Sequence, residues 1–138
     1  MDRIVASVRI DNALDASKRL SCDAFVDTGV LLMVLPEPWK DRLGKLDSTR
    51  SIELETATHG TIKGQICGPV RVQLDGFRPI FTELLFADMK TEQCEPLIGN
   101  IVLAQSQARI DMLGHRLIHI KHMDLKSYHS HRPSTFAT

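Results

Sequence analysis

Residues 24–30 read Ala-Phe-Val-Asp-Thr-Gly-Val, so a carboxylate, a hydroxyl group and a glycine interrupt an otherwise apolar sequence. An aspartate between two buried runs loses its hydration, which is costly unless the group is paired or protonated. Asp27 is therefore expected to be either a turn residue or a working acid. The motif alone does not decide between the two, because Asp and Gly are also common in turns.

The flanking sequence predicts short strands on both sides of this motif. Residues 4–10 alternate between apolar and polar side chains, which is typical of a half-buried strand. Residues 30–35 are continuously apolar and predict a strand buried on both faces, whereas the polar residues 15–19 predict a loop. Further strands are predicted at residues 22–26, 52–56, 62–66, 70–74, 77–86, 110–112 and 117–120.

Helix signals are few. Residues 37–43 could form a short helix that ends at Gly44. Asn100 is placed to cap a more convincing helix over residues 101–107. Many strands and one short helix in the C-terminal half predict a mostly β domain, built as a small barrel or sandwich.

Composition narrows the class of protein. The chain has 138 residues, 43% of them hydrophobic, and its 17 basic residues balance 17 acidic ones. This length suits one domain, expected over residues 1–122, followed by a polar tail, exposed or disordered, over residues 123–138. A net charge of zero argues against nucleic acid as a partner. The sequence has neither a membrane-length apolar run nor a signal-peptide core, so we expect a cytoplasmic protein with no membrane partner.

The cysteines and histidines do not form a metal-binding pattern. Cys22, Cys67 and Cys94 are odd in number and widely spaced, so we expect free thiols. Five of the histidines lie near the C-terminus without the spacing of a known ligand set. No metal and no other cofactor is expected.

Four segments, by their sequence and their order along the chain, resemble parts of the retropepsin-like family, the single-lobe aspartic proteases of retroviruses and bacteria. The Asp27 motif between apolar runs resembles the active-site loop of that family. Residues 97–103, Leu-Ile-Gly-Asn-Ile-Val-Leu, resemble its later segment of two apolar residues, a glycine and a helix. Residues 58–61, Thr-His-Gly-Thr, stand where the family has its flap, and residues 109–120 resemble the segment that closes the lobe.

The resemblance implies a single-lobe acid-protease barrel that acts as a homodimer, because the chain carries one such loop and is too short for two lobes. Asp27 of each chain would form a catalytic dyad that shares one proton. Thr28 would hydrogen-bond across the dimer axis, and the amide of Gly29 would bond a carboxylate. No metal or cofactor takes part in the chemistry of this family.

The resemblance also implies an extended peptide or protein substrate, held under the flap by His59 and Gly60. The chain termini often build the dimer sheet in this family, and residues 1–5 and 117–121 are the corresponding segments here. Asp23 is expected to be an exposed strand residue, because strand geometry separates it from Asp27 by about 13 Å.

The sequence departs from the family at two places and leaves two functions open. Val30 stands where Ala or Ser is usual, and Leu31 and Leu32 stand where retroviral members have a second acidic residue. The chain is thus expected to be either an aspartic endopeptidase or a catalytically silent dimer of the same fold that binds peptides. An α/β hydrolase or transferase is disfavoured, because the sequence has neither a Gly-x-Ser-x-Gly motif nor a phosphate loop.

Overall fold

The computed structural model describes residues 3–56, 60–87 and 95–120. Within these ranges the chain forms nine strands, one 3-10 helix and one α-helix. In chain order they are β1 (Val5–Asn12), β2 (Asp15–Val26), β3 (Met33–Pro36), η1 (Glu37–Leu43), β4 (Ser48–Thr56), β5 (Gly60–Leu74), β6 (Ile80–Ala87), β7 (Leu97–Ile98), α1 (Asn100–Ser106), β8 (Ala108–Asp111) and β9 (Arg116–His119).

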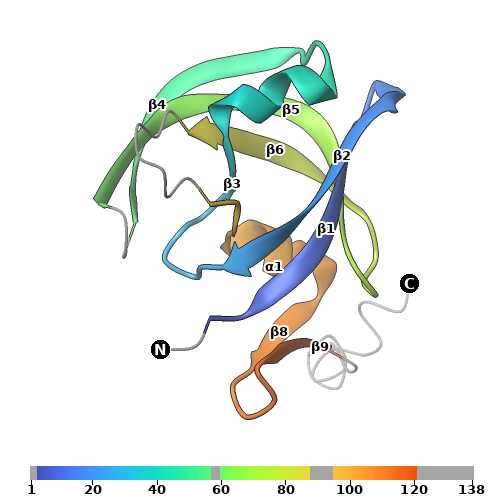
Figure 1. Ribbon diagram of the computed structural model, residues 1–138, viewed down its shortest axis with the longest axis vertical. Helices are drawn as coiled ribbons and strands as arrows, with labels where there is room; N and C mark the ends of the chain where they lie inside the picture. The colour runs from blue at the N-terminus through green and yellow to red at the C-terminus, as the bar shows by residue number, and fades with distance from the viewer. Residues whose placement is uncertain (1–2, 57–59, 88–94, 121–138) are drawn as a thin grey trace, which may run out of the picture.

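Seven strands form one curved sheet in the order β1-β2-β7-β3-β6-β5-β4, and a further pairing of β1 with β5 folds the sheet toward a barrel (Figure 1). The short strand β7 pairs in parallel with the end of β2 and antiparallel with β3. Strands β8 and β9 form a separate two-stranded sheet. The prediction of a mostly β domain is confirmed.

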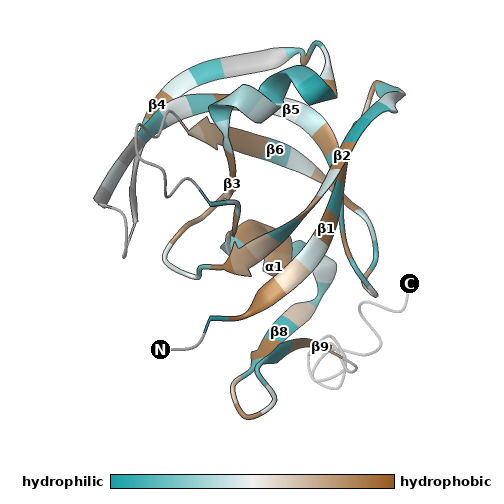
Figure 2. Ribbon diagram, in the orientation of Figure 1, coloured by the Kyte–Doolittle hydropathy of each residue, from teal (hydrophilic) through white to brown (hydrophobic). Residues whose placement is uncertain are grey.

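The main core lies between the walls of this barrel, and strand alternation builds it. Val8 and Ile10 of β1 point inward and are buried, while their neighbours Ser7 and Arg9 are exposed. Figure 2 shows the same contrast, with apolar segments along β3, β6 and α1 and polar segments on the outer hairpins. The inward side chains join one large buried cluster that α1 covers from below.

A second, smaller apolar cluster supports the segment that follows β2. It consists of buried side chains from that segment and from β3, β5, β6 and β7, namely Val30, Val34, Ile66, Leu85, Ala87 and Leu97. Phe25 and Leu32 pack against it and remain partly exposed. Val30 is 1% exposed, so its side chain packs fully inside this cluster.

Two strand predictions were wrong in extent. Residues 15–19 were predicted as a loop but form the first part of β2, where Arg19 pairs with Asp11 of β1. This part of the hairpin is exposed, so it lacks the apolar alternation that marks a half-buried strand. The apolar residues 30–32 do not belong to β3, and the carbonyl groups of Val30 and Leu31 are bonded to α1 instead.

The fold has two helices where one was expected. α1 is the expected helix of the C-terminal half, and η1 is the short helix that residues 37–43 could form. η1 is a 3-10 helix that ends at Gly44. Gly44 has a φ of 67°, which glycine adopts easily because it has no side chain. The tail over residues 123–138 lies outside the described residues. Among the described residues, no helix is long and apolar enough to cross a membrane.

Candidate active site

Asp27 lies directly after β2, in a tight turn that fixes its carboxylate. Its backbone N–H donates to the carbonyl of Ile98 in β7 at 3.0 Å. Its carbonyl accepts from the N–H of Val30 at 3.1 Å, and its Oδ1 accepts from the N–H of Gly29 at 2.9 Å. The turn therefore orients the carboxylate through a backbone donor rather than through a mobile side chain.

The N-terminus of α1 anchors the other side of this turn. The Asn100 side chain donates from Nδ2 to the carbonyl of Thr28 at 2.7 Å. The backbone N–H groups of Asn100 and Ile101 donate to the carbonyls of Val30 and Leu31, at 2.9 and 3.0 Å. Two N–H groups at the start of α1, which lack partners within the helix, are thus bonded by carbonyls of the segment that carries Asp27.

This anchoring corrects the role expected for Asn100. It was expected to cap α1, but Gly99 holds the N-cap position, with no side-chain cap bond. The amide side chain of Asn100 instead ties down the turn that carries Asp27. Sequence reasoning missed this role, because an Asn before a helix is most often a cap and the partner carbonyl lies 72 positions away.

Gly99 lets the helix and the turn approach each other. A Cβ atom at this position would lie 2.4 Å from the carbonyl oxygen of Leu32 and 2.6 Å from that of Leu31. Contacts this short with backbone atoms force the chain to move. The absence of a side chain at Gly99 is therefore a structural requirement of the Asp27 turn.

Apolar residues that are exposed or partly buried flank Asp27 in the sequence. Phe25, near the end of β2, and Leu32, after the turn, are only partly buried. Leu31 is 56% exposed, although it is a large apolar residue. Asp27 is half-buried, and Thr28 and Gly29 are exposed.

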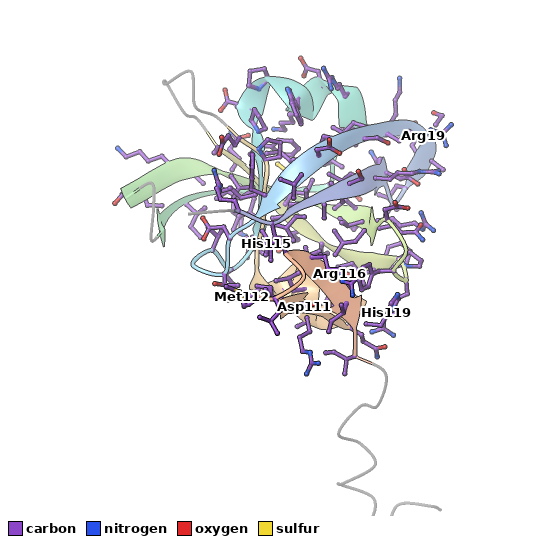
Figure 3. The ribbon with its side chains drawn as sticks, turned by 60° about the horizontal axis from the view of Figure 1, so that its bottom comes forward. Arg19, Asp111, Met112, His115, Arg116 and His119 are labelled. Atoms are coloured by element: carbon purple, nitrogen blue, oxygen red, sulfur yellow. The ribbon has the colours of Figure 1, made fainter. Side chains whose placement is uncertain are left out.

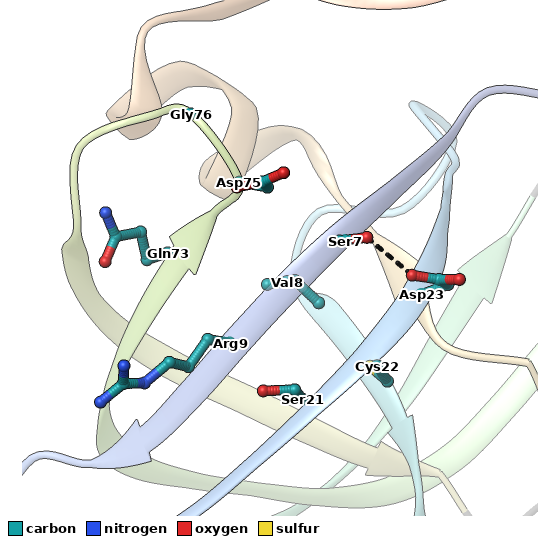
Figure 4. Close-up of a pocket in the computed structure, with 9 residues that line it drawn as sticks. All are labelled: Ser7, Val8, Arg9, Ser21, Cys22, Asp23, Gln73, Asp75 and Gly76. Atoms are coloured by element: carbon teal, nitrogen blue, oxygen red, sulfur yellow. Dashed lines mark hydrogen bonds between the residues drawn. The ribbon is translucent and has the colours of Figure 1, made fainter.

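Asp23 does not join Asp27. It is exposed on β2, and its Oδ1 accepts a hydrogen bond from the Ser7 hydroxyl at 2.8 Å (Figure 4). A hollow of about 580 Å³ lies beside this pair, with Arg9 and Asp75 among its lining residues. Asp27 is not part of its wall. The Asp27 turn and this hollow are therefore separate features of the molecule.

Cys22 is a poor candidate nucleophile. Burial raises the pKa of its thiol to about 11, and the neighbouring Asp23 carboxylate adds to this shift. The protonated thiol dominates at neutral pH and is a weak nucleophile. Cys67 is buried, and neither cysteine forms a disulfide. Cys94 lies outside the described residues.

The described histidines lie on the β8–β9 hairpin (Figure 3). His115 is exposed in its turn, and the His119 ring stacks on Phe77 with the ring centroids 4.2 Å apart. Over residues 3–56, 60–87 and 95–120, no three His, Cys, Asp or Glu side chains come together as metal ligands.

The expected flap is only partly described. β4 and β5 form a long antiparallel hairpin whose last described pair is Thr56 with Gly60. Gly60 therefore begins β5, and His59 lies outside the described residues. The position of either residue relative to a substrate stays a prediction.

Comparison with known proteins identifies the fold. No family model matches the chain, and no curated protein matches it either. Among solved structures, the chain is similar to the EIAV protease complexed with the inhibitor HBY-793. The TM-score is 0.58 and the sequence identity 21%, over 80% of this chain and 94% of that one.

A second solved structure gives the same result. The retroviral protease-like domain of Ddi1 from Leishmania major aligns with a TM-score of 0.53 and 19% identity, over 88% of this chain and 91% of that one. The expected resemblance is confirmed at the level of the fold, which is retropepsin-like.

Proposed function

We propose that this chain is one half of an aspartic endopeptidase whose active site forms between two copies. One observation carries the proposal: Asp27 lies in a turn fixed by its own Gly29 amide and by α1, within a retropepsin-like fold. Each copy of the chain would contribute one Asp27 turn to such a site. Peptide hydrolysis by carboxylates needs an acid and a base, so a second Asp27 from a partner copy would complete the pair.

The chemistry follows from the closeness of the two carboxylates. Two such groups cannot both ionise, so they share one proton and titrate as a pair. The ionised carboxylate takes a proton from a water molecule held between them, and this water attacks the peptide carbonyl carbon. The protonated partner donates to the developing oxyanion. The pair then passes a proton to the leaving nitrogen, and no covalent intermediate forms.

The other proposed site residues support this step. Thr28 is exposed beside Asp27 and would hydrogen-bond across the two-fold axis. Gly29 already donates its amide to the carboxylate. His59 and Gly60 would close over the peptide from the β4–β5 hairpin, which would pair with the substrate as an added strand.

A peptide library separates this proposal from a silent peptide-binding dimer of the same fold. We expect the purified protein to cleave some library peptides at mildly acidic to neutral pH, and a pepstatin-type inhibitor to block the cleavage. Cleavage products identified by mass spectrometry would give the position of the cut. Intact peptides across this pH range would contradict the peptidase proposal and leave the binding function.

Exposed apolar residues of the β8–β9 hairpin support the proposed homodimer. Leu113 in its turn is 98% exposed and Met112 is 72% exposed. The start of β1, with the exposed Val5, lies on the same lower side of the molecule (Figure 1). Exposed apolar side chains that gather on one side are typical of an association surface. Residues 3–5 and 117–120 are the described parts of the segments expected to build the dimer sheet, and they belong to this side.

Replacing Leu113 with Asp should weaken the dimer and lower activity together. Burying a new charge between two copies is unfavourable, so we expect the dimer dissociation constant to rise at least about tenfold. Analytical ultracentrifugation would measure it, with kcat/KM followed over the same protein concentrations. Leu14→Asp is the matched control, because Leu14 is 63% exposed in the distant β1–β2 turn. Equal dissociation constants for the two variants would exclude the hairpin from the interface.

A further inference from the structure

The hollow beside Asp23 lies on the outer face of the sheet, where β2, β1 and β5 run side by side (Figure 4). Ser7 of β1 pairs with Asp23 of β2, and the N–H of Asp75, directly after β5, donates to the Ser7 carbonyl at 2.9 Å. The three exposed side chains therefore form one row across three neighbouring segments, along the wall of the hollow. We call Asp23, Ser7 and Asp75 the acidic row.

The unused hydrogen-bonding capacity of the acidic row is that of acceptors. The Ser7 hydroxyl donates to Oδ1 of Asp23 at 2.8 Å, which leaves Oδ2 of that carboxylate for another donor. Over residues 3–56, 60–87 and 95–120, the carboxylate of Asp75 has no hydrogen-bond partner and forms no ion pair. A ligand with several N–H donors and a positive charge would satisfy both carboxylates.

The donor side chains that line the same hollow are bonded to other groups. Arg9 donates to both carboxylate oxygens of Asp11, at 3.1 and 3.4 Å, so its charge is balanced by that carboxylate. The Gln73 amide donates to the carbonyl of Phe77 at 2.9 Å. The two carboxylates of the acidic row thus leave the hollow with excess negative charge, which favours a cationic group.

The C-terminal segment, residues 121–138, supplies such groups from the same chain. It lies outside the described residues, and its sequence has three Lys or Arg residues against one acidic residue. The three are Lys121, Lys126 and Arg132. The whole chain has 17 basic and 17 acidic residues, so this segment is more basic than the rest. Its charge is therefore complementary to the acidic row.

The C-terminal segment begins close to the acidic row. Ile120 is the last described residue, and the ring of its neighbour His119 stacks on Phe77 with the ring centroids 4.2 Å apart. Phe77 belongs to the same turn as Asp75, two positions further along the chain. An extended chain spans at most about 3.5 Å per residue, so the six positions from Ile120 to Lys126 reach up to about 20 Å. The first lysines of the segment are thus within reach of the row.

We propose that residues 121–138 dock on this outer face of their own chain, with the ammonium group of Lys121 or Lys126 bound between Asp23 and Asp75. Strand spacing separates the Cα atoms of the two aspartates by about 10 Å, so an ammonium group above the central serine reaches both carboxylates. The docked segment ties the end of β9 to the turn after β5. The surface is separate from the candidate active site, so the inference goes beyond the proposed function and does not depend on peptide cleavage.

Chymotrypsin measures this docking, because it cuts after Tyr128 in the middle of the C-terminal segment. Its sites are not created or removed by changes of Asp or Lys. The rate at which the product 129–138 forms is followed by mass spectrometry in the full-length protein. A synthetic peptide of residues 121–138 gives the rate without protection. We expect the protein to be cut after Tyr128 at least about tenfold more slowly than the peptide.

Charge changes on the sheet test the assigned contacts. Asp23→Lys combined with Asp75→Lys should bring the rate of the protein to within about twofold of that of the peptide. Asp41→Lys combined with Asp47→Lys is the matched control, because these carboxylates are exposed in and after η1, outside the hollow. The control variant should keep the protection of the wild type. Circular dichroism would check that both proteins are folded.

Charge changes in the C-terminal segment complete the test, because they leave the sheet unchanged. Lys121→Gln combined with Lys126→Gln, made in the protein and in the peptide, should remove the difference between their rates. Equal protection in the wild type and in both the lysine and the Asp23/Asp75 variants would overturn the assignment. Absence of protection in the wild type would exclude docking. Protection that disappears on dilution would overturn docking within one chain, since the segment of another copy would then occupy the face.

Discussion

Replacing Asp27 with Asn is expected to reduce kcat/KM for peptide cleavage by a factor on the order of 10³–10⁴. An amide can neither accept a proton from water nor share one with a partner carboxylate, so both copies of the site lose their acid–base group. The Asn oxygen can still accept the Gly29 amide bond that Asp27 accepts at 2.9 Å. The fold and the dimer should therefore persist, which circular dichroism and ultracentrifugation would check.

Asp23→Asn is the matched control for this loss. Asp23 is an exposed carboxylate of the same strand, bonded to the Ser7 hydroxyl and absent from the proposed chemistry. We expect its kcat/KM to stay within about twofold of the wild type. Full activity of the Asp27→Asn protein, or an equal loss in both variants, would exclude Asp27 as the working acid.

Replacing Gly99 with Ala is expected to disrupt the site through sterics. The new Cβ would lie 2.4 Å from the Leu32 carbonyl oxygen, and a backbone group cannot rotate away as a flexible side chain can. Overpacking of this kind lowers the free energy of unfolding by about 3 kcal/mol. The turn that carries Asp27 should also shift, because the helix N–H groups that bond its carbonyls move with residue 99. We expect kcat/KM to fall by more than the loss of folded protein alone would cause.

Gly76→Ala serves as the control for Gly99→Ala. Gly76 has a φ of 85°, and a Cβ atom added there would have no other atom within 4 Å. The cost of Gly76→Ala therefore comes from backbone conformation alone, about 1 kcal/mol. Gly99 has a φ of −91°, which alanine adopts without strain. Urea unfolding and peptide cleavage of both variants measure the two effects. A Gly99→Ala protein as stable and as active as Gly76→Ala would show that the close approach is not needed.

Local sequence signals predicted those parts of the fold that depend on residues close together in the chain. Alternation over residues 4–10 predicted most of β1, and the glycine at position 44 predicted the end of η1, because both signals depend on near neighbours. The exposed half of β2 was missed, since an exposed hairpin arm buries neither face and leaves no periodic signal.

Contacts of the site that join residues far apart in the chain could not be predicted from local sequence signals. The Asp-Thr-Gly motif pointed to Asp27, but its anchoring depends on Asn100 and on the parallel pairing of β2 with β7. Parallel pairing joins distant segments and has no turn signature in the sequence.

Subunit mixing tests the central claim most directly. Wild-type and Asp27→Asn chains are combined in known proportions, refolded together at constant total concentration and assayed for peptide cleavage. At equal proportions, random pairing leaves about one quarter of the dimers with two Asp27 side chains, so activity should fall to about one quarter. Activity should follow the square of the wild-type fraction across the series. A linear decrease, with about one half of the activity at equal proportions, would show that each chain acts alone and would contradict a site shared between two copies.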